Sequence, residues 1–131
     1  MNTKKGFTVF EIIVVAVFVT ISIILFLIQK SNLDAMERDE ARKSAINAMY
    51  YALEEGFYKE NGYYPEEINE DVIPYIDPAL WSDPFGFYIN DSNGAYSYTP
   101  ASCKKGKCEE YVLKTMLEKE DDYIKNSRAS Y

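Results

Sequence analysis

An apolar run of 22 residues near the N-terminus, from Phe7 to Ile28, most constrains what this chain can fold into. At about 1.5 Å per residue, a helix of that length is about 33 Å long, which is enough to cross a hydrocarbon core of about 30 Å. Glu11 is the only ionisable side chain in the run. The sequence therefore predicts a membrane-spanning helix that carries one carboxylate near its N-terminal end.

The position of Glu11 needs a physical explanation. A carboxylate at the centre of a membrane helix costs about 2.5–3.5 kcal/mol, and a position nearer the end lowers that cost without removing it. Two interpretations stay open on physical grounds. Either the carboxylate reaches the headgroup layer, or it has a cationic partner that only a later event supplies.

The residues before the apolar run do not form an ordinary secretory signal. Such a signal has a basic start, an apolar stretch of about 7–15 residues, and small residues before a cleavage site that follows the stretch. Lys4 and Lys5 provide the basic start, but the run is longer and the small residue Gly6 precedes it. Cleavage after Gly6 would leave the whole apolar helix on the mature chain and create a new α-amino group at Phe7.

The segment Lys4-Lys5-Gly6-Phe7-Thr8, with Glu11 at the fifth position after the glycine, resembles the class III signal of type IV pilins and pseudopilins. The resemblance implies that a prepilin peptidase of the membrane cleaves after Gly6 and methylates the Phe7 amine. It also implies that Glu11 pairs with the N-terminal amine of a neighbouring subunit, which would set the register of assembly. The likeness is close over residues 1 to about 65 and loose beyond them.

The helix is expected to continue past the apolar run. The segment from Gln29 to Asn61 contains no proline and only one glycine, Gly56. Many of its residues favour helix, and one apolar face recurs at helical spacing. That face consists of Ile46, Met49, Tyr50, Leu53 and Phe57. We expect one continuous helix from about Phe7 to about Asn61, ended by a left-handed residue at Asn61-Gly62.

The charge-rich middle of this helix, residues 34–43, is expected to be a solvated face, or alternatively to form salt bridges between subunits. Lys30, Arg38, Arg42 and Lys43 follow the apolar run, so counting positive charges does not by itself orient the helix in the membrane. The resemblance implies a cytoplasmic N-terminus and an exported head.

Turn residues and alternating patterns after Gly62 predict a small sheet. Residues 66–84 are expected to be a loop with short helical pieces, and residues 83–88 resemble the segment that leads into the sheet of major pseudopilins. Phe87–Asn90 and Ala95–Thr99 are expected to be strands on either side of a turn at residues 91–94. Alternation over Tyr111–Leu117 predicts a third strand, and the tail 118–131 shows no clear strand.

The expected fold class is α+β, and the resemblance implies the type IV pilin fold, with a long helix packed on an antiparallel sheet that has one face in water. Four segments follow: a leader at 1–6, a transmembrane and assembly helix at 7–28, its continuation onto the head at 29–61, and the head at 62–131. Many pilins have a glycine and a proline inside the membrane helix. This run has neither, so the sequence lacks the signal that in this family accompanies local melting of the helix on assembly, and both outcomes stay open.

Cys103 and Cys108 enclose Lys104, Lys105, Gly106 and Lys107. Because the chain resembles an exported one, we expect a disulfide between these cysteines, which would fix the tip that joins the last two strands. A zinc site is not expected, since the chain has no other cysteine and no histidine. The three lysines are either a solvated turn or a contact for DNA or another anionic surface.

Composition excludes several functions. The 131 residues leave about one hundred for a single small domain after the apolar run, and 21 acidic against 14 basic residues argue against nucleic acid as the partner of the bulk surface. Without histidine no Ser/His/Asp set exists, and adjacent acids such as Glu54-Glu55 point apart, so no enzyme is expected. The 12 tyrosines either cover a thin core or form an adhesive surface. No cofactor is expected.

Calcium remains a minor alternative, because major pseudopilins often bind it in a late loop. No spacing here resembles an EF-hand. The candidate ligands are Asp77, Asp83, Asp91, Asp121 and Asp122.

The resemblance implies a structural subunit of a type IV pilus that forms a helical homo-oligomer. Its partners would be the prepilin peptidase, a pilus assembly platform and, before assembly, the lipid bilayer. It would pass from the cytoplasmic membrane to an extracellular pilus that serves adhesion, twitching motility or DNA uptake. The alternatives are the major pseudopilin of a type II secretion or competence machine, and a membrane-anchored binding protein that does not polymerise.

Overall fold

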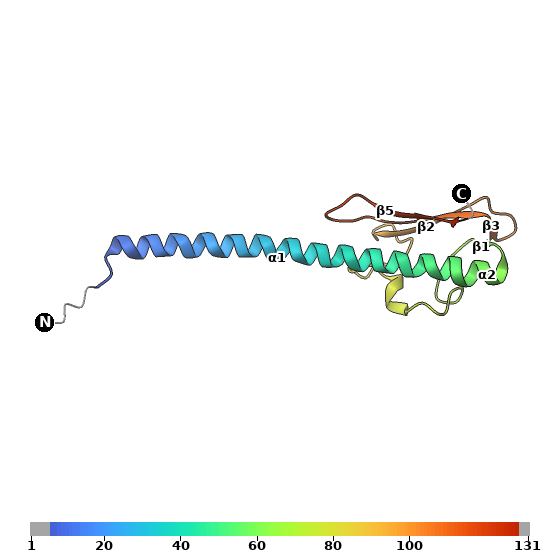
Figure 1. Ribbon diagram of the computed structural model, residues 1–131, viewed down its shortest axis with the longest axis horizontal. Coiled ribbons are helices and arrows are strands. Elements are labelled where there is room, and N and C mark those ends of the chain that lie inside the picture. The colour runs from blue at the N-terminus through green and yellow to red at the C-terminus, as the bar shows by residue number, and fades with distance from the viewer. Residues whose placement is uncertain (1–5, 129–131) are drawn as a thin grey trace. The chain divides into compact units, whose positions relative to one another are not determined.

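The computed structural model describes residues 6–128 and shows a long helical run followed by a small β head (Figure 1). The helical run consists of α1 (Val9–Tyr51), a π-helical turn η1 (Ala52–Phe57) and α2 (Tyr58–Asn61). The chain divides between Ala35 and Met36 into two compact units, which are described separately.

The expectation of one long helix is confirmed over Val9–Asn61, a run of 53 residues. It begins two residues after Phe7. Gly62 ends it in the left-handed region, with φ of 75°, as the Asn61-Gly62 pair predicts. The Gly62 N–H donates to the Tyr58 carbonyl at 2.7 Å, which caps the last turn.

The π-helical turn at Ala52–Phe57 was not predicted. Its wider backbone meets the side chain of Tyr75, whose hydroxyl donates to the Ala52 carbonyl at 3.4 Å. A Cβ atom at Gly56 would lie 2.3 Å from that same hydroxyl oxygen. Glycine at position 56 therefore leaves room for the Tyr75 ring against the helix.

Two antiparallel sheets form the head. The smaller one pairs β1 (Tyr64–Pro65) with β3 (Lys107–Cys108). The larger one has the order β2 (Tyr96–Ala101), β4 (Glu110–Thr115), β5 (Tyr123–Asn126). A 3₁₀ turn, η2 (Pro78–Trp81), lies in the long loop between helix and sheet. The expected α+β fold, with one long N-terminal helix and an antiparallel head, is confirmed.

The predicted strand Phe87–Asn90 is wrong. Only Tyr88 forms an isolated bridge there, with Ser82. Asn90 has a positive φ of 65°, which extended strands do not allow. The turn at residues 91–94 therefore leads into β2, which begins at Tyr96 and not Ala95.

The third predicted strand is confirmed as β4, with the expected alternation: Tyr111, Leu113 and Thr115 are buried, whereas Val112 is exposed. The expectation that the tail has no strand is wrong, because β5 pairs with β4 from Tyr123 to Asn126. This strand is short and has mixed polarity, so backbone pairing with β4 and not its own side-chain pattern defines it.

One buried cluster joins the helix to the sheet. The helical face predicted from the sequence contributes Ile46, Met49 and Leu53, each of them fully buried. The rest of the cluster comes from the loop and the strands: Tyr64, Ile68, Ile73, Ile76, Trp81, Ile89, Tyr96, Tyr98, Cys108, Tyr111 and Leu113, with Ala45 of α1. Four of these are tyrosines, which supports the interpretation that tyrosine rings fill a thin core.

The charge-rich middle of the helix is not simply a solvated face. Asp39 and Arg42 are buried, at 2% and 3% exposure, and Arg42 donates to Asp39 Oδ1 at 2.8 Å. Their other partner is Glu118, in the loop between β4 and β5. The expected solvated face is therefore wrong at these two positions, because this loop covers the helix.

Candidate functional site

Glu11 and Thr8 form a reciprocal cap at the start of the apolar helix. The backbone N–H and the hydroxyl of Thr8 donate to Glu11 Oε2 at 2.8 and 3.1 Å. The Glu11 N–H donates back to the Thr8 hydroxyl oxygen at 3.4 Å. The Ile12 N–H reaches the Thr8 carbonyl at 3.2 Å, which makes Thr8 the residue that caps the helix. This arrangement is a capping box.

The cap provides hydrogen bonds to the Glu11 carboxylate within a single chain. A carboxylate in the first turn lies at the positive end of the helix dipole and accepts hydrogen bonds from donors that the helix leaves without partners. Glu11 is thus partly stabilised within a single chain. Among the described residues, Glu11 has no cationic side chain as a salt-bridge partner. The spacing Thr-x-x-Glu was the sequence signal for this cap, and our interpretation of the motif overlooked it.

The residues around the expected cleavage site lie before the helix. Gly6 and Phe7 are not helical, and Phe7 is 79% exposed. Apart from the chain neighbours of Gly6, no described residue has an atom within 4 Å of the position that a Cβ of Gly6 would take. Lys4 and Lys5 fall outside the described residues. The bond between Gly6 and Phe7 therefore lies in an exposed, non-helical segment.

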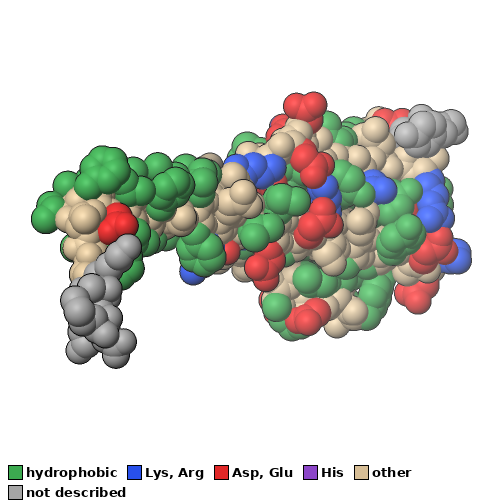
Figure 2. Space-filling model, turned by 60° about the vertical axis from the view of Figure 1, so that its left-hand side comes forward, with side chains coloured by type: hydrophobic (Ala, Val, Ile, Leu, Met, Phe, Trp, Pro, Cys, Tyr) green, Lys and Arg blue, Asp and Glu red, His purple; other side chains and the backbone are tan. Residues whose placement is uncertain are grey.

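The apolar helix has no protein cover of its own. Every large hydrophobic side chain from Phe7 to Ile28 is more than a third exposed, and Val14, at 37%, is the least exposed of them. Hydrophobic side chains dominate this segment in the space-filling view (Figure 2). Among residues 6–128 this is the one helix that is long and apolar enough to cross a membrane, with a mean hydropathy of 3.0.

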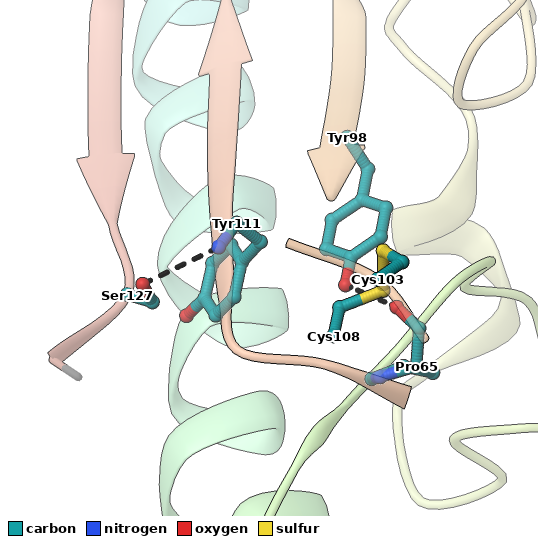
Figure 3. Close-up of a disulfide and its surroundings, with 6 residues drawn as sticks. All are labelled: Pro65, Tyr98, Cys103, Cys108, Tyr111 and Ser127. Carbon is teal, nitrogen blue, oxygen red and sulfur yellow. Dashed lines mark hydrogen bonds between the residues drawn. A yellow bond between two sulfur atoms is a disulfide. The ribbon is translucent and has the colours of Figure 1, made fainter. Parts of the chain in front are cut away.

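The disulfide between Cys103 and Cys108 is present, as expected (Figure 3). Cys108 is buried beside Tyr98, whose hydroxyl donates to the Pro65 carbonyl at 2.6 Å. The bond therefore ties the β2–β4 connection to the small sheet. The loop lysines are all exposed, and Lys107 lies 4.7 Å from the centre of the Tyr63 ring.

An ion-pair network that the sequence did not predict holds the loop between β4 and β5 on α1. Arg38 donates two hydrogen bonds to Glu118, at 2.8 and 2.7 Å, and Arg42 adds a third at 2.9 Å. Lys43 pairs with Glu120 at 2.8 Å. Hydrogen bonds from Arg38, opposed by partial burial and supported by Arg42, lower the pKa of Glu118 to about 2. The network therefore stays ionised at neutral pH.

A second buried carboxylate, Glu54, lies in the π-helical turn among tyrosines. It accepts hydrogen bonds from the hydroxyls of Tyr64 and Tyr111, at 3.0 and 2.8 Å, and from the Arg128 N–H at 3.1 Å. Burial, together with this contact to Glu54, raises the pKa of the Tyr111 phenol well above its ordinary value. Glu55, its neighbour in sequence, is exposed and pairs with Lys59, so these adjacent acids do point apart.

The five aspartates considered for calcium do not come together. Asp77 and Asp91 accept backbone N–H groups in their own turns, the buried Asp83 accepts those of Phe85 and Phe87, and Asp122 pairs with Lys114. Within residues 6–128 no group of three or more acidic or cysteine side chains is placed to hold a metal ion. We therefore describe no metal site.

The fold and the N-terminal site define an α+β protein whose single long helix begins with a capped glutamate and an exposed apolar surface. No family model, no curated protein and no solved structure matches the chain.

Proposed function

We propose that this chain is the structural subunit of a type IV pilus or a related filament, assembled from a membrane pool. The observation that carries the proposal is the apolar helix, exposed on all sides with Glu11 as its one ionisable group. Such a surface requires lipid or the helices of other copies around it. The residues from Lys4 to Glu11 resemble a class III signal. This resemblance favours lipid around the helix first, and the helices of other copies after assembly.

In the membrane, lipid covers the helix, and the capping box with Thr8 partly stabilises the Glu11 carboxylate. In the filament, helices of neighbouring copies replace the lipid. The amine created at Phe7 by cleavage is then the cation that Glu11 lacks. At low dielectric the attraction between a desolvated carboxylate and an ammonium group is strong. Packing that places Glu11 next to the Phe7 amine of a neighbouring copy is therefore favoured over misaligned packing.

Three features of the head suit an exported subunit. A disulfide is stable outside the reducing cytosol, and the Cys103–Cys108 bond fixes an exposed loop. The ion-pair network ties the β4–β5 loop to the helix. Tyrosine rings fill the thin core. Together these contacts hold the head in one small folded body, which supports the role of a structural subunit.

Electron microscopy of sheared surface filaments, with mass spectrometry of their subunit, tests the proposal. We expect filaments whose subunit begins at Phe7 with a methylated amine. A processed chain that belongs to a membrane machine and is missing from sheared surface filaments favours the alternative of a major pseudopilin. A processed or unprocessed chain that stays monomeric in the membrane under all conditions contradicts the proposal and favours a non-polymerising binding protein.

A further inference from the structure

A buried carboxylate, Glu54, lies in the core of the head without a counter-charge. Glu54 is 4% exposed, and among residues 6–128 no lysine or arginine side chain forms a salt bridge with it. The side chains of Lys59 and Arg128 pair with its exposed neighbour Glu55 instead. A buried charge with no counter-charge raises the free energy of the folded state. A reaction that neutralises Glu54 in place therefore relieves an existing cost.

Two buried tyrosines donate to this carboxylate. The Tyr111 hydroxyl donates to Glu54 Oε1 at 2.8 Å, and the Tyr64 hydroxyl donates to Oε2 at 3.0 Å. The third donor is the backbone N–H of Arg128, at 3.1 Å. Both hydroxyl oxygens lie within the range of about 2.6–3.2 Å at which a proton can pass along a hydrogen bond. Glu54 is therefore placed to accept a proton from either phenol.

The tyrosine rings are in contact from the core to the surface of the head. The centre of the Tyr64 ring lies 4.7 Å from that of Tyr111, edge to face, and 4.6 Å from that of Tyr58, on which it stacks. Tyr58 is half-buried, whereas Tyr64 and Tyr111 are 0% and 1% exposed. Rings at these separations touch one another. An electron can therefore pass from the buried pair to an oxidant that reaches only Tyr58.

Proton transfer makes oxidation at this site differ from oxidation at an exposed tyrosine. A phenol that loses one electron becomes a strong acid and also loses its proton. An exposed tyrosine releases that proton to water, whereas Tyr111 can release it to Glu54. The products in the core are then a neutral radical and a neutral carboxylic acid, so the unpaired charge of Glu54 disappears. Burial favours this outcome, because a neutral group is less costly than a charge in a low dielectric.

The phenol is in the protonated form that such a reaction needs. Burial, together with the hydrogen bond to Glu54, raises the pKa of Tyr111 well above its ordinary value. The proton therefore stays on the oxygen at neutral pH until an electron is removed.

We propose that Tyr111 is a redox-active tyrosine whose phenolic proton passes to Glu54 when a soluble one-electron oxidant removes an electron. The oxidant gains the electron, the O–H bond of Tyr111 breaks, and a new O–H bond forms on Glu54. A one-electron reductant such as ascorbate reverses both transfers. Tyr64 is the relay, because its ring contacts both Tyr58 and Tyr111. The inference does not depend on filament assembly, since all of these residues belong to the head.

Flash oxidation of the full-length chain in detergent tests the proposal. Tris(bipyridine)ruthenium is excited by a laser, oxidised by hexaammineruthenium(III) as quencher, and then accepts an electron from the protein. Transient absorption and electron paramagnetic resonance follow the phenoxyl radical. We expect a radical that persists at least about tenfold longer than the radical of free tyrosine under the same flash, since burial keeps it from reaction partners. A wild-type chain without such a long-lived radical overturns the proposal.

Tyrosine variants locate the radical. Tyr111→Phe, which removes only the hydroxyl, should lower the yield of the long-lived radical at least about tenfold. Tyr51→Phe is the matched control, because it removes the same group from a ring that is 56% exposed, and its yield should equal that of the wild type. Circular dichroism checks that each variant is folded. Wild-type yield from folded Tyr111→Phe overturns the assignment of the radical.

The proton step separates this role from a merely structural one and needs no variant. With Glu54 as acceptor, oxidation of the wild type should be slower in D₂O and should not depend on buffer concentration. A rate that rises with buffer concentration shows that solvent takes the proton, and it overturns the role of Glu54. Glu54→Gln should in addition slow the oxidation by about 10²-fold, the lower end of what a positioned proton acceptor contributes.

Discussion

Both carboxylate oxygens of Asp39 accept the backbone N–H of Glu118, 79 residues further along the chain, at 2.9 and 3.0 Å. Oδ2 also accepts the Lys119 N–H at 2.9 Å, and Oδ1 accepts Arg42 at 2.8 Å. One buried side chain of α1 thus satisfies the backbone at the start of the β4–β5 connection. The loop depends on a charge that the helix provides.

The first prediction concerns this carboxylate. Asp39→Asn keeps the size of the side chain but places an amide N–H₂ against backbone donors. It also removes the buried counter-charge of Arg42, which keeps only the partly exposed Glu118. We expect a loss of about 3 kcal/mol in the free energy of unfolding. Denaturant unfolding of the full chain in detergent, followed by tyrosine fluorescence, measures it. Glu37→Gln is the control, because it also removes one negative charge from the same helix but at an exposed position. Its free energy of unfolding should stay within about 0.5 kcal/mol of wild type.

The second prediction is a loss of stability in acid. Burial raises the pKa of Asp39, but the N–H groups of Glu118 and Lys119, together with Arg42, outweigh it and hold that pKa below its ordinary value. Arg38 lowers the pKa of Glu118 to about 2. Both pKa values are depressed in the folded state, so the stabilisation is complete above the unfolded values near about 4.

Stability should therefore be flat from neutral pH down to about pH 5 and should fall as the pH drops from about 4 toward about 2. Thermal unfolding midpoints across this range measure the effect. In Glu118→Gln the fall should be smaller, because one of the two titrating groups is gone. An equal fall in this variant would show that other carboxylates dominate the acid response.

The third prediction uses the close approach of Tyr75 to Gly56. Gly56→Ala gains about 1 kcal/mol of helix propensity, but the new methyl group must displace the exposed Tyr75 ring. We expect the change to be within about 1 kcal/mol of neutral in the wild-type background. In a Tyr75→Ala background the same change should stabilise by about 1 kcal/mol. A double-mutant cycle of unfolding free energies gives the coupling, and a coupling of zero would contradict the contact.

The fourth prediction concerns the disulfide. Alkylation before and after reduction should find no free thiol at Cys103 or Cys108 in exported protein. Reduction should cost about 2 kcal/mol by chain entropy, because the closed loop is short. Amide exchange should then rise first at β3, which contains Cys108, and at β1, which pairs with it. Uniform loss of protection over β2, β4 and β5 would argue that the bond stabilises the whole head.

The fifth prediction separates two roles of Glu11. Glu11→Gln preserves a side chain that can cap the helix but removes the charge, whereas Thr8→Val removes the hydroxyl but leaves the carboxylate. If Glu11 pairs with the amine of a neighbour, Glu11→Gln and Glu11→Ala should be processed and inserted but lose filament yield by about 10²–10³. Thr8→Val should assemble nearly as well as wild type.

Membrane levels and sheared filament yields, compared for the three variants, decide between these roles. Normal assembly of Glu11→Gln together with poor assembly of Thr8→Val would make capping the main role of the pair. Glu11→Asp should be intermediate if charge pairing holds, because its side chain is one methylene shorter.

Features of the fold that rest on a pattern repeated over many consecutive residues were predictable from the sequence. The apolar run, the helical face with Ile46 and Leu53, and the alternation through β4 each repeat over enough residues to specify an element. Gly62 marks the helix end because its left-handed backbone favours glycine. The disulfide followed from the number of cysteines and the expected compartment.

The features that were missed depend on partners far away in the sequence. β5 has little pattern of its own and is defined by backbone pairing with β4. Asp39 and Arg42 look like solvated helix residues until the Glu118 loop covers them. The Thr8–Glu11 cap is the exception, because it is local and its spacing was visible in the sequence.

Glu54 has a consequence for the order in which the head is completed during synthesis. Its hydrogen-bond donors belong to residues 10, 57 and 74 positions later: Tyr64, Tyr111 and Arg128. A nascent chain therefore carries this carboxylate, already on a forming helix, long before the ribosome has added the groups that satisfy it.

The unsatisfied carboxylate opposes premature collapse of the helix onto an incomplete sheet, since burying it without donors is costly. A head released before Arg128 is made would keep the hydroxyl donors of Tyr64 and Tyr111 but would leave Glu54 without the hydrogen bond from the Arg128 N–H.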